Sequence, residues 1–267
     1  MIVPYNIIRR SIMQILTYRL SVFGDFKRFV PTSENTIIWT QGFKNAGYEL
    51  IPSIIQNTQA VMSIPFFNIP QGAIDKRMQF SSLDGNIIVR FLAERVDVEF
   101  TMGNSNKYSQ YFVENIQKAC NLLSVALNIL GNIKGTRVAY FTDILIEENQ
   151  NNCFESFYSN NADIFINNYD GEYIEWQHRF NKRIFLDIAH TQERVNTILQ
   201  MESGELQTIV QSTGVQQIIK GLHVMADINT IAENTTERFD IDSSLEFCNK
   251  AQELYLDLLN QIMIKNI

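Results

Sequence analysis

The chain has 267 residues, with 22 Lys and Arg against 29 Asp and Glu, so its formal net charge is -7. Apolar residues make up 45% and charged residues 19%, which excludes disordered, collagen-like and coiled-coil proteins and leaves ample chain for a buried core. The acidic balance argues against a general binder of nucleic acids or anionic membranes. No motif in the sequence identifies a function, so the expected architecture is used to limit the possible functions.

The N-terminal residues do not resemble a secretory signal peptide, because Arg9 and Arg10 follow the apolar stretch instead of preceding it. An uncharged run covers residues 51–74 and is long enough to cross a bilayer. It contains Pro52, Pro65 and Pro70, which a spanning helix tolerates poorly. We expect loops and short strands there, and a cytoplasmic protein without a membrane partner.

The three cysteines, Cys120, Cys153 and Cys248, are an odd number and lack Cys-x-x-Cys spacing. Cys120 and Cys248 fall within apolar helical stripes, where a thiol acts as a small core side chain. This usage fits a reducing compartment.

In chain order, the first expected elements are strands at residues 77–83 and 86–100, joined by a turn at Asp84-Gly85. An amphipathic helix follows at residues 107–130, with apolar residues recurring every three or four positions and Gly131 and Gly135 after its end. Alternating apolar residues then predict a strand at residues 137–147.

Further strands are expected at residues 164–166, 174–186, 195–201, 206–210 and 222–228, with turns at Asp170-Gly171 and Ser203-Gly204. The strand at 222–228 carries His223, Met225 and Asp227 on its second face. A final helix is expected at residues 244–264, with Ser243 before its start and Glu246 in its first turn at capping-box spacing.

The apolar stripe of this last helix contains Leu254 and Leu258. We expect both to face the sheet that contains residues 222–228, so that Leu258→Ala costs about 2–5 kcal/mol of stability. A small effect on stability combined with weaker assembly would instead indicate that the helix docks on a partner chain.

The two halves of the chain look alike, because each has hairpins, a strand ending in an acidic residue, a polar loop and a long helix. We therefore expect an α+β fold of two similar units, residues 1–131 and 135–267, each an antiparallel β-sheet covered by a long amphipathic helix. Such an internal duplication is SecB-like by analogy.

The sharpest enzymatic hypothesis involves Asp163, Glu175 and Gln177. Metal-dependent nucleases of the restriction-endonuclease type hold a divalent cation between carboxylates on adjacent strands, with a third residue that orients water. This hypothesis requires the carboxylates of Asp163 and Glu175 to lie about 4 to 6 Å apart. The alternative interpretation is a solvent-facing strand edge, and catalytic residues remain unknown.

Other candidate sites are weaker. His178, His190 and His223 lack zinc-ligand spacing, and Arg183 and His190 fall where no shared helical face is expected. The sequence indicates no cofactor and no resident metal, because the usual nucleotide-binding and nucleophile motifs are absent.

Basic residues interleave with aromatic ones in the first part of the chain, as with Arg19 and Lys27-Arg28 among Tyr18, Phe23, Phe26 and Phe29. This pattern fits either a phosphate-binding surface or, as we favour, core aromatics with a solvated rim. Lys182-Arg183 forms a second small basic cluster. Nucleic acid is disfavoured as a partner but left open.

The strings Arg77-Met-Gln-Phe-Ser-Ser-Leu-Asp-Gly85, Ala93-Glu-Arg-Val-Asp97 and Asp227-Ile-Asn-Thr230 resemble a sporadically distributed family of uncharacterised bacterial proteins of about this size. The resemblance implies a β-rich body followed by a helix, used twice. It implies no site residues, because the family has no agreed activity. Its distribution fits mobile elements or phage-defence loci.

These observations favour a non-enzymatic protein-binding or assembly module, whose partner is another protein or a second copy of the chain. A sheet edge would accept a strand from that partner. The alternatives are the metal-dependent nuclease and a SecB-like chaperone, which requires an exposed apolar groove larger than ordinary monomers show.

Overall fold

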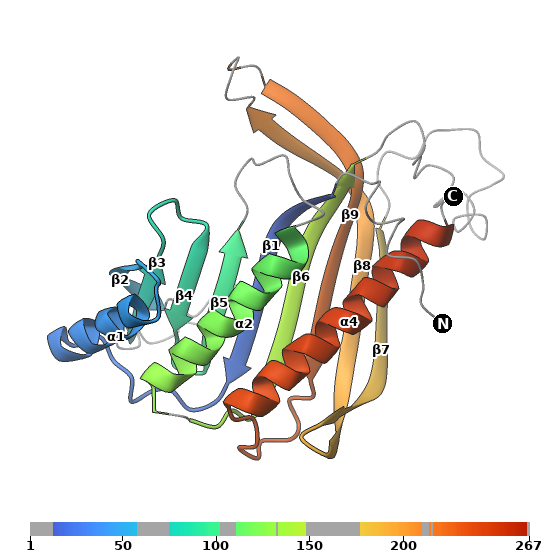
Figure 1. Cartoon of the computed structure of the whole chain (residues 1–267). Helices are drawn as coiled ribbons and strands as arrows, with labels where there is room; N and C mark the ends of the chain where they lie inside the picture. The colour runs from blue at the N-terminus through green and yellow to red at the C-terminus, as the bar shows by residue number, and fades with distance from the viewer. Residues whose placement is uncertain are drawn as a thin grey trace, which may run out of the picture.

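Strand pairing joins both halves of the chain into a single antiparallel sheet of nine strands (Figure 1). The computed structural model describes residues 13–57, 75–101, 111–131, 133–147, 177–209, 214 and 216–265. Its elements are β1 (Met13–Phe23), α1 (Ser33–Asn45), β2 (Ile51–Asn57), β3 (Asp75–Ser81), β4 (Ile87–Phe91), β5 (Arg95–Thr101), α2 (Tyr111–Ile129), β6 (Arg137–Glu147), β7 (Gln177–Ile188), β8 (Thr191–Ile209), β9 (Gln216–Thr230) and α4 (Ile241–Lys265).

The predicted fold of two sheets, each covered by its own helix, is wrong. The strand order is β2-β3-β4-β5-β1-β6-β9-β8-β7, and β1 pairs with β5 on one side and with β6 on the other. The central strand therefore joins the two halves, because each of its sides offers backbone groups that another strand can satisfy. The predicted division between residues 1–131 and 135–267 falls in the loop between α2 and β6. The division of the chain into these two units stays a prediction.

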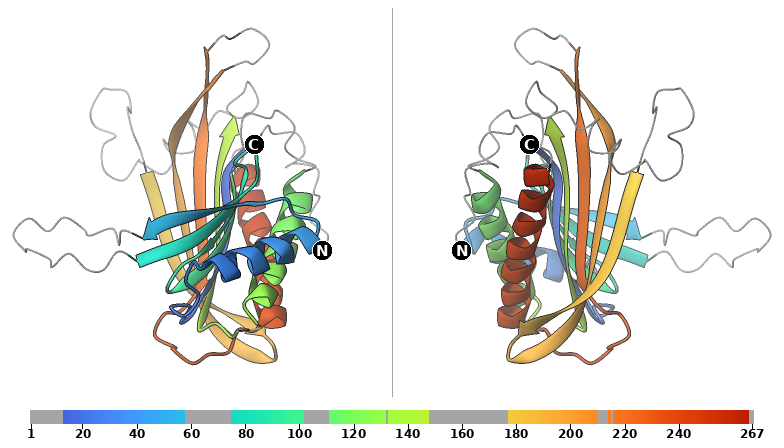
Figure 2. Two further views of the ribbon diagram at one scale, coloured as in Figure 1. Left: turned by 90° about the vertical axis from the view of Figure 1, so that its left-hand side faces the viewer. Right: turned by 90° about the vertical axis from the view of Figure 1, so that its right-hand side faces the viewer.

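The described helices lie on one face of the sheet, which we call the helix face (Figure 2). α2 packs on β1 and β5, α4 packs on β6, and the two helices also touch each other. Their side-by-side placement covers the middle of one continuous sheet. Within the described residues, none of the helices combines the length and apolarity needed to span a membrane.

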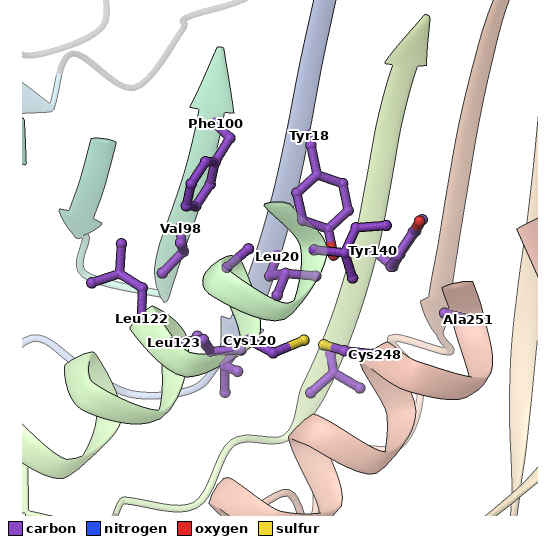
Figure 3. Close-up of a cluster of buried hydrophobic side chains, with 14 of the residues drawn as sticks. Tyr18, Leu20, Val98, Phe100, Cys120, Leu122, Leu123, Tyr140, Cys248 and Ala251 are labelled. Carbon is purple, nitrogen blue, oxygen red and sulfur yellow. The ribbon is translucent and has the colours of Figure 1, made fainter. Parts of the chain in front are cut away.

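The core lies between these helices and the alternating apolar side chains of the central strands (Figure 3). β1 contributes Leu20 and β6 contributes Tyr140, both fully buried. Cys120 of α2 and Cys248 of α4 are buried free thiols that point toward one another where the helices meet. The prediction that these cysteines are core residues is confirmed, whereas Cys153 lies outside the described residues.

α1 was not predicted from the sequence. Thr32 caps it by accepting a hydrogen bond from the backbone N–H of Asn35, at 3.1 Å. Its buried residues Trp39 and Phe43 pack on aromatic side chains of β3 and β4. Ile37 and Ile38 are exposed on its outer side, so the apolar residues of this segment do not form the single stripe that would have indicated a helix.

The predicted turn at Asp84-Gly85 is confirmed, since Gly85 has a φ of 72° between β3 and β4. The predicted turn at Ser203-Gly204 is wrong, because β8 continues through it and Gly204 pairs with Gly221 of β9. A Cβ on Gly221 would lie 2.1 Å from the backbone oxygen of Ile146. This glycine pair therefore permits close strand approach and does not mark a turn.

The helix ends differ in detail from the predictions. α2 ends at Ile129, and Gly131 follows its end with a φ of 85°, as expected. α4 begins at Ile241, so Ser243 is not its cap. Asp240 takes that role, because its Oδ1 accepts hydrogen bonds from the backbone N–H and the hydroxyl of Ser243, which lower the pKa of this carboxyl. Glu246 is free for another contact, described below.

Candidate functional site

β7 forms one edge of the sheet and is exposed along almost its whole length. It pairs with β8 on one side, and within the described residues no strand lies on its other side. Ile188 is the only buried residue among its 12, and the side chains of Phe180 and Phe185, on opposite faces, are 54% and 62% exposed. Natural proteins rarely leave a long edge strand with exposed aromatic residues open, because it is a template for pairing with another chain.

The turn that joins β7 to β8 determines which backbone groups face the open edge. Ala189 and His190 have φ values of 47° and 62°, and Ile188 pairs with Thr191, which defines a two-residue turn of type I′. The residues that flank such a turn exchange both hydrogen bonds, and pairs then alternate along the strands. The N–H groups that point away from β8 are therefore those of Arg179, Asn181 and the other odd-numbered residues of β7.

The turn end of the hairpin is fastened to α4. The backbone N–H of Ala189 donates to Oε2 of Glu246, at 2.9 Å. Lys250 donates to the backbone oxygen of Asp187 and forms an ion pair of 2.8 Å with Glu246. The hydrogen bond from Lys250 is the main reason why the pKa of Glu246 is lowered. These contacts close one end of the space between hairpin and helix.

At the other end the hairpin and α4 separate, as Figure 2 shows on its right side. A groove of about 520 Å³ lies between them, within the range of about 300–1,000 Å³ typical of ligand sites. Leu199 and Met201 of β8 are part of its buried lining, and Phe180 of β7 stands at its exposed side. Its lining residues are His178, Phe180, Lys182, Ile184, Thr197, Leu199, Met201, Leu254, Leu258, Gln261 and Ile262.

Leu254 and Leu258 face the sheet, as predicted, but across this groove and opposite β7 and β8. Both are half-buried, and the fully buried stripe of α4 instead contains Tyr255 and Leu259. The sequence stripe thus combined two sides of the helix that have different environments. Leu258 is a groove residue and not a core residue.

The groove also contains an unpaired polar group. The hydroxyl of Thr197 is buried and has no hydrogen-bond partner among the described residues. Burial of an unpaired hydroxyl costs stability, so it is a candidate contact for a polar group of a bound molecule. His178 and Phe180 stack nearby, with ring centroids 6.3 Å apart.

β7 is basic, although the chain as a whole is acidic. It carries Arg179, Lys182 and Arg183 against the single carboxylate of Asp187. Arg179 donates to a neutral partner, the amide oxygen of Gln200, at 3.1 Å. The candidate functional site is therefore the edge of β7 together with the groove, with Lys182 in the groove lining and both arginines on the edge strand itself.

The residues of the nuclease hypothesis are not brought together by any described contact. Asp163 and Glu175 lie outside the described residues, so their separation stays a prediction. Gln177 is the first residue of β7, and its Nε2 donates to Oε2 of Glu202, at 2.7 Å. Within the described part of the chain, no group of His, Cys, Asp and Glu is arranged to hold a metal ion.

Glu202 belongs to a cluster that was missed in the sequence. His223 of β9 lies between Asp143 of β6 and Glu202 of β8, on the face opposite the helices. Its Nδ1 is 2.9 Å from Oε1 of Glu202, and its Nε2 contacts Asp143. Both ring nitrogens are thus engaged, so the cluster ties three strands together and offers no free nitrogen for catalysis.

The pKa shifts fit this role. The hydrogen bond with Asp143 is the main cause of a raised pKa of His223. Burial opposes ionisation of Glu202, but hydrogen bonds from Gln177 and His223 outweigh it and lower the pKa of that carboxyl. The alternation of apolar and polar residues in β9 placed His223 on the polar face, whereas its partners are 80 and 21 positions away and could not be identified.

The remaining histidines and basic residues do not form a joint site. His178 lies in the groove and His190 in the hairpin turn. Arg19 is paired with Glu99 and lies over the ring of Phe141. Tyr18 and Phe26 are buried, which confirms the favoured interpretation that these two aromatic residues belong to the core.

In comparisons with known proteins, no family model, no curated protein and no solved structure matches this chain. The resemblance to a bacterial family therefore stays a prediction. The edge strand and the groove are thus the features from which a function can be inferred.

Proposed function

We propose that the protein is a binding module that takes up an extended segment of another protein along β7. The added segment would pair with the open edge of the sheet and place alternate side chains in the groove beside α4. The observation that carries this proposal is the long exposed edge strand directly beside an apolar groove. Main-chain pairing supplies affinity in this mode of recognition, and side-chain pockets supply specificity.

The geometry suits a strand in particular. The outward N–H and C=O groups recur at every second residue of β7, and an extended chain presents its own groups at the same interval. Each new hydrogen bond contributes about 0.5–1.5 kcal/mol net. Apolar side chains of the segment would also cover Phe180 and Leu258, which now contact water.

A substitution at Asn181 tests the proposal, because its N–H points away from β8. Asn181→Pro removes a donor from the open edge and leaves the β7–β8 ladder intact, as proline permits on edge strands. Asn181→Ala is the matched control. Peptides selected from a random displayed library against the whole chain should bind wild type and Asn181→Ala equally, and Asn181→Pro at least about tenfold more weakly.

Thermal melts of both variants check that the fold is kept. Selected peptides that bind Asn181→Pro as well as Asn181→Ala would refute strand addition at β7. Enrichment of apolar peptides without any common pattern would indicate chaperone-like capture in the groove. Failure to enrich any peptide would count against the whole proposal.

A further inference from the structure

The charges on β7 restrict which segment can pair with it. Arg179 and Arg183 are four residues apart on the face opposite the helices, and Lys182 lines the groove on the helix face. Side chains directly opposite one another on paired antiparallel strands have Cβ atoms about 4.5–5.5 Å apart. A segment added to β7 would therefore bring its own side chains within reach of both guanidinium groups.

The present partners of these cations leave them available. Arg183 donates from Nε to Oδ1 of the uncharged Asn196, at 3.0 Å, and its Nη2 is 3.4 Å from Oε1 of Glu233. The side chains of this ion pair are 52% and 64% exposed. Exposed pairs of this kind are weak and exchange readily. Arg179 contacts only the uncharged Gln200 among the hydrogen bonds found for it in the described residues.

We infer that the partner is an acidic extended segment of another protein, an inference that rests on the function proposed above. Its acidic residues would stand four apart, opposite Arg179 and Arg183. The residues beside them would be apolar, because they enter the groove next to Phe180 and Ile184. The recognised pattern is thus apolar residues on one face of the strand and carboxylates on the other.

A second copy of the chain fits this site poorly. Two β7 strands in antiparallel overlap would bring Arg179, Lys182 and Arg183 of both chains into one short stretch, and like charges on paired strands are destabilising. A nucleic acid would match the cations and stack on Phe180. However, it would leave the apolar groove unfilled and the outward N–H groups of β7 without strand partners, while the net charge of -7 would repel it.

The test uses two designed peptides that have matched lengths and backbone propensities. The first has the core Val-Glu-Val-Thr-Val-Glu-Val, and its twin has Lys in place of both Glu. Fluorescence anisotropy with the full chain, at about 0.05 M and about 0.5 M salt, measures the affinity of each peptide. The acidic peptide should bind at least about tenfold more tightly at low salt, and the preference should shrink at high salt.

Charge reversal at the site provides the decisive comparison. The double variant Arg179→Glu with Arg183→Glu should bind the Lys peptide more tightly than the Glu peptide. Asn181→Ala should keep the original preference, and Asn181→Pro should weaken both peptides. A double variant that prefers the same peptide as wild type would overturn the inference, since the site's own charges would then not select the partner.

Failure of this inference is distinguishable from failure of the proposed function. Equal binding of both peptides, lost in Asn181→Pro, would refute acidic selection and leave strand addition intact. Acidic selection is equally refuted if library peptides bind through β7 and both designed peptides fail. Tighter binding of a 12-nucleotide oligothymidylate, displaced by neither peptide and weakened by the double variant, would overturn both proposals in favour of a nucleic-acid site.

Discussion

Two neighbouring leucines of α4 lie in different environments, one in the groove and one in the core. Leu259 is 2% exposed in the core, whereas Leu258 is half-buried on the groove wall. Because Leu258→Ala and Leu259→Ala are the same chemical change one position apart on one helix, intrinsic helix propensity affects both equally. Any difference between the two variants therefore reports packing.

The expected magnitudes differ clearly. Leu259→Ala removes a fully buried side chain and leaves a cavity, so it should cost about 2–5 kcal/mol of unfolding free energy. Leu258→Ala leaves no enclosed cavity, because the side chain lies on an open groove. It loses only part of the about 1.5–3 kcal/mol that full burial of a leucine contributes, so the expected cost is about 1 kcal/mol of unfolding free energy. This value is below the range that the sequence stripe had suggested.

Urea unfolding followed by far-UV circular dichroism measures the two costs, and Glu253→Ala on the exposed side of α4 is the baseline. Binding of a library-selected peptide should weaken about tenfold in Leu258→Ala and remain within about twofold in Leu259→Ala, provided that each variant is folded at the assay temperature. Equal losses of stability would refute this reasoning, because Leu258 would then pack in the core as the sequence indicated.

Two further changes test the contacts around the site. The pKa of His223 is raised from 6.5, so its contacts stabilise the fold fully below about pH 6.5, and this stabilisation is lost as pH rises through the folded pKa. The pKa of Glu202 is lowered from 4.5, so the stabilisation from its carboxylate is lost as pH falls through the folded pKa of that carboxyl. The stability difference between wild type and His223→Gln should therefore be largest at about pH 5–6.5 in urea titrations, and a difference independent of pH would contradict the cluster's role. Ala189→Gly should raise the melting temperature and increase the free energy of unfolding by about 1 kcal/mol, because glycine adopts a φ of 47° without steric strain. Ala226→Gly, within a strand, should lower stability instead, and equal effects would show that Ala189 is unstrained.

Local periodicity in the sequence identified many of the helices and strands, but it did not identify which strands are neighbours in the sheet. Alternation in residues 137–147 and 222–228 predicted β6 and the middle of β9, and the spacing of three and four predicted α2. The order of strands was not predictable, because alternation tells which residues share a face and not which strands are neighbours. The sequence therefore suggested two sheets where the chain forms one.

The candidate site depends on relations of this second kind. β7 was partly predicted as a strand at residues 174–186, but its position at the edge follows from the strand order. The turn at Ala189-His190 has none of the Gly, Asn or Asp residues that usually accept positive φ. Gly204 was interpreted as a turn residue, but it lies within β8 and pairs with Gly221 of β9. Arg183 was noted in the sequence for its spacing from His190 and for its place beside Lys182, but its position on an open sheet edge could not be predicted from either.

The same cations explain how such an edge can stay unpaired and yet recognise a partner. Natural proteins protect exposed edges with charges, particularly positive ones, which oppose pairing with further copies. On β7 the basic residues are interspersed with Phe180, Ile184 and Phe185. The apolar side chains that favour pairing therefore lie next to positive charges that oppose pairing with a second copy. A strand that brings carboxylates to Arg179 and Arg183 turns this opposition into attraction, and it gains the groove and the free backbone groups as well. Protection from aggregation and selection of an acidic partner thus follow from one set of side chains.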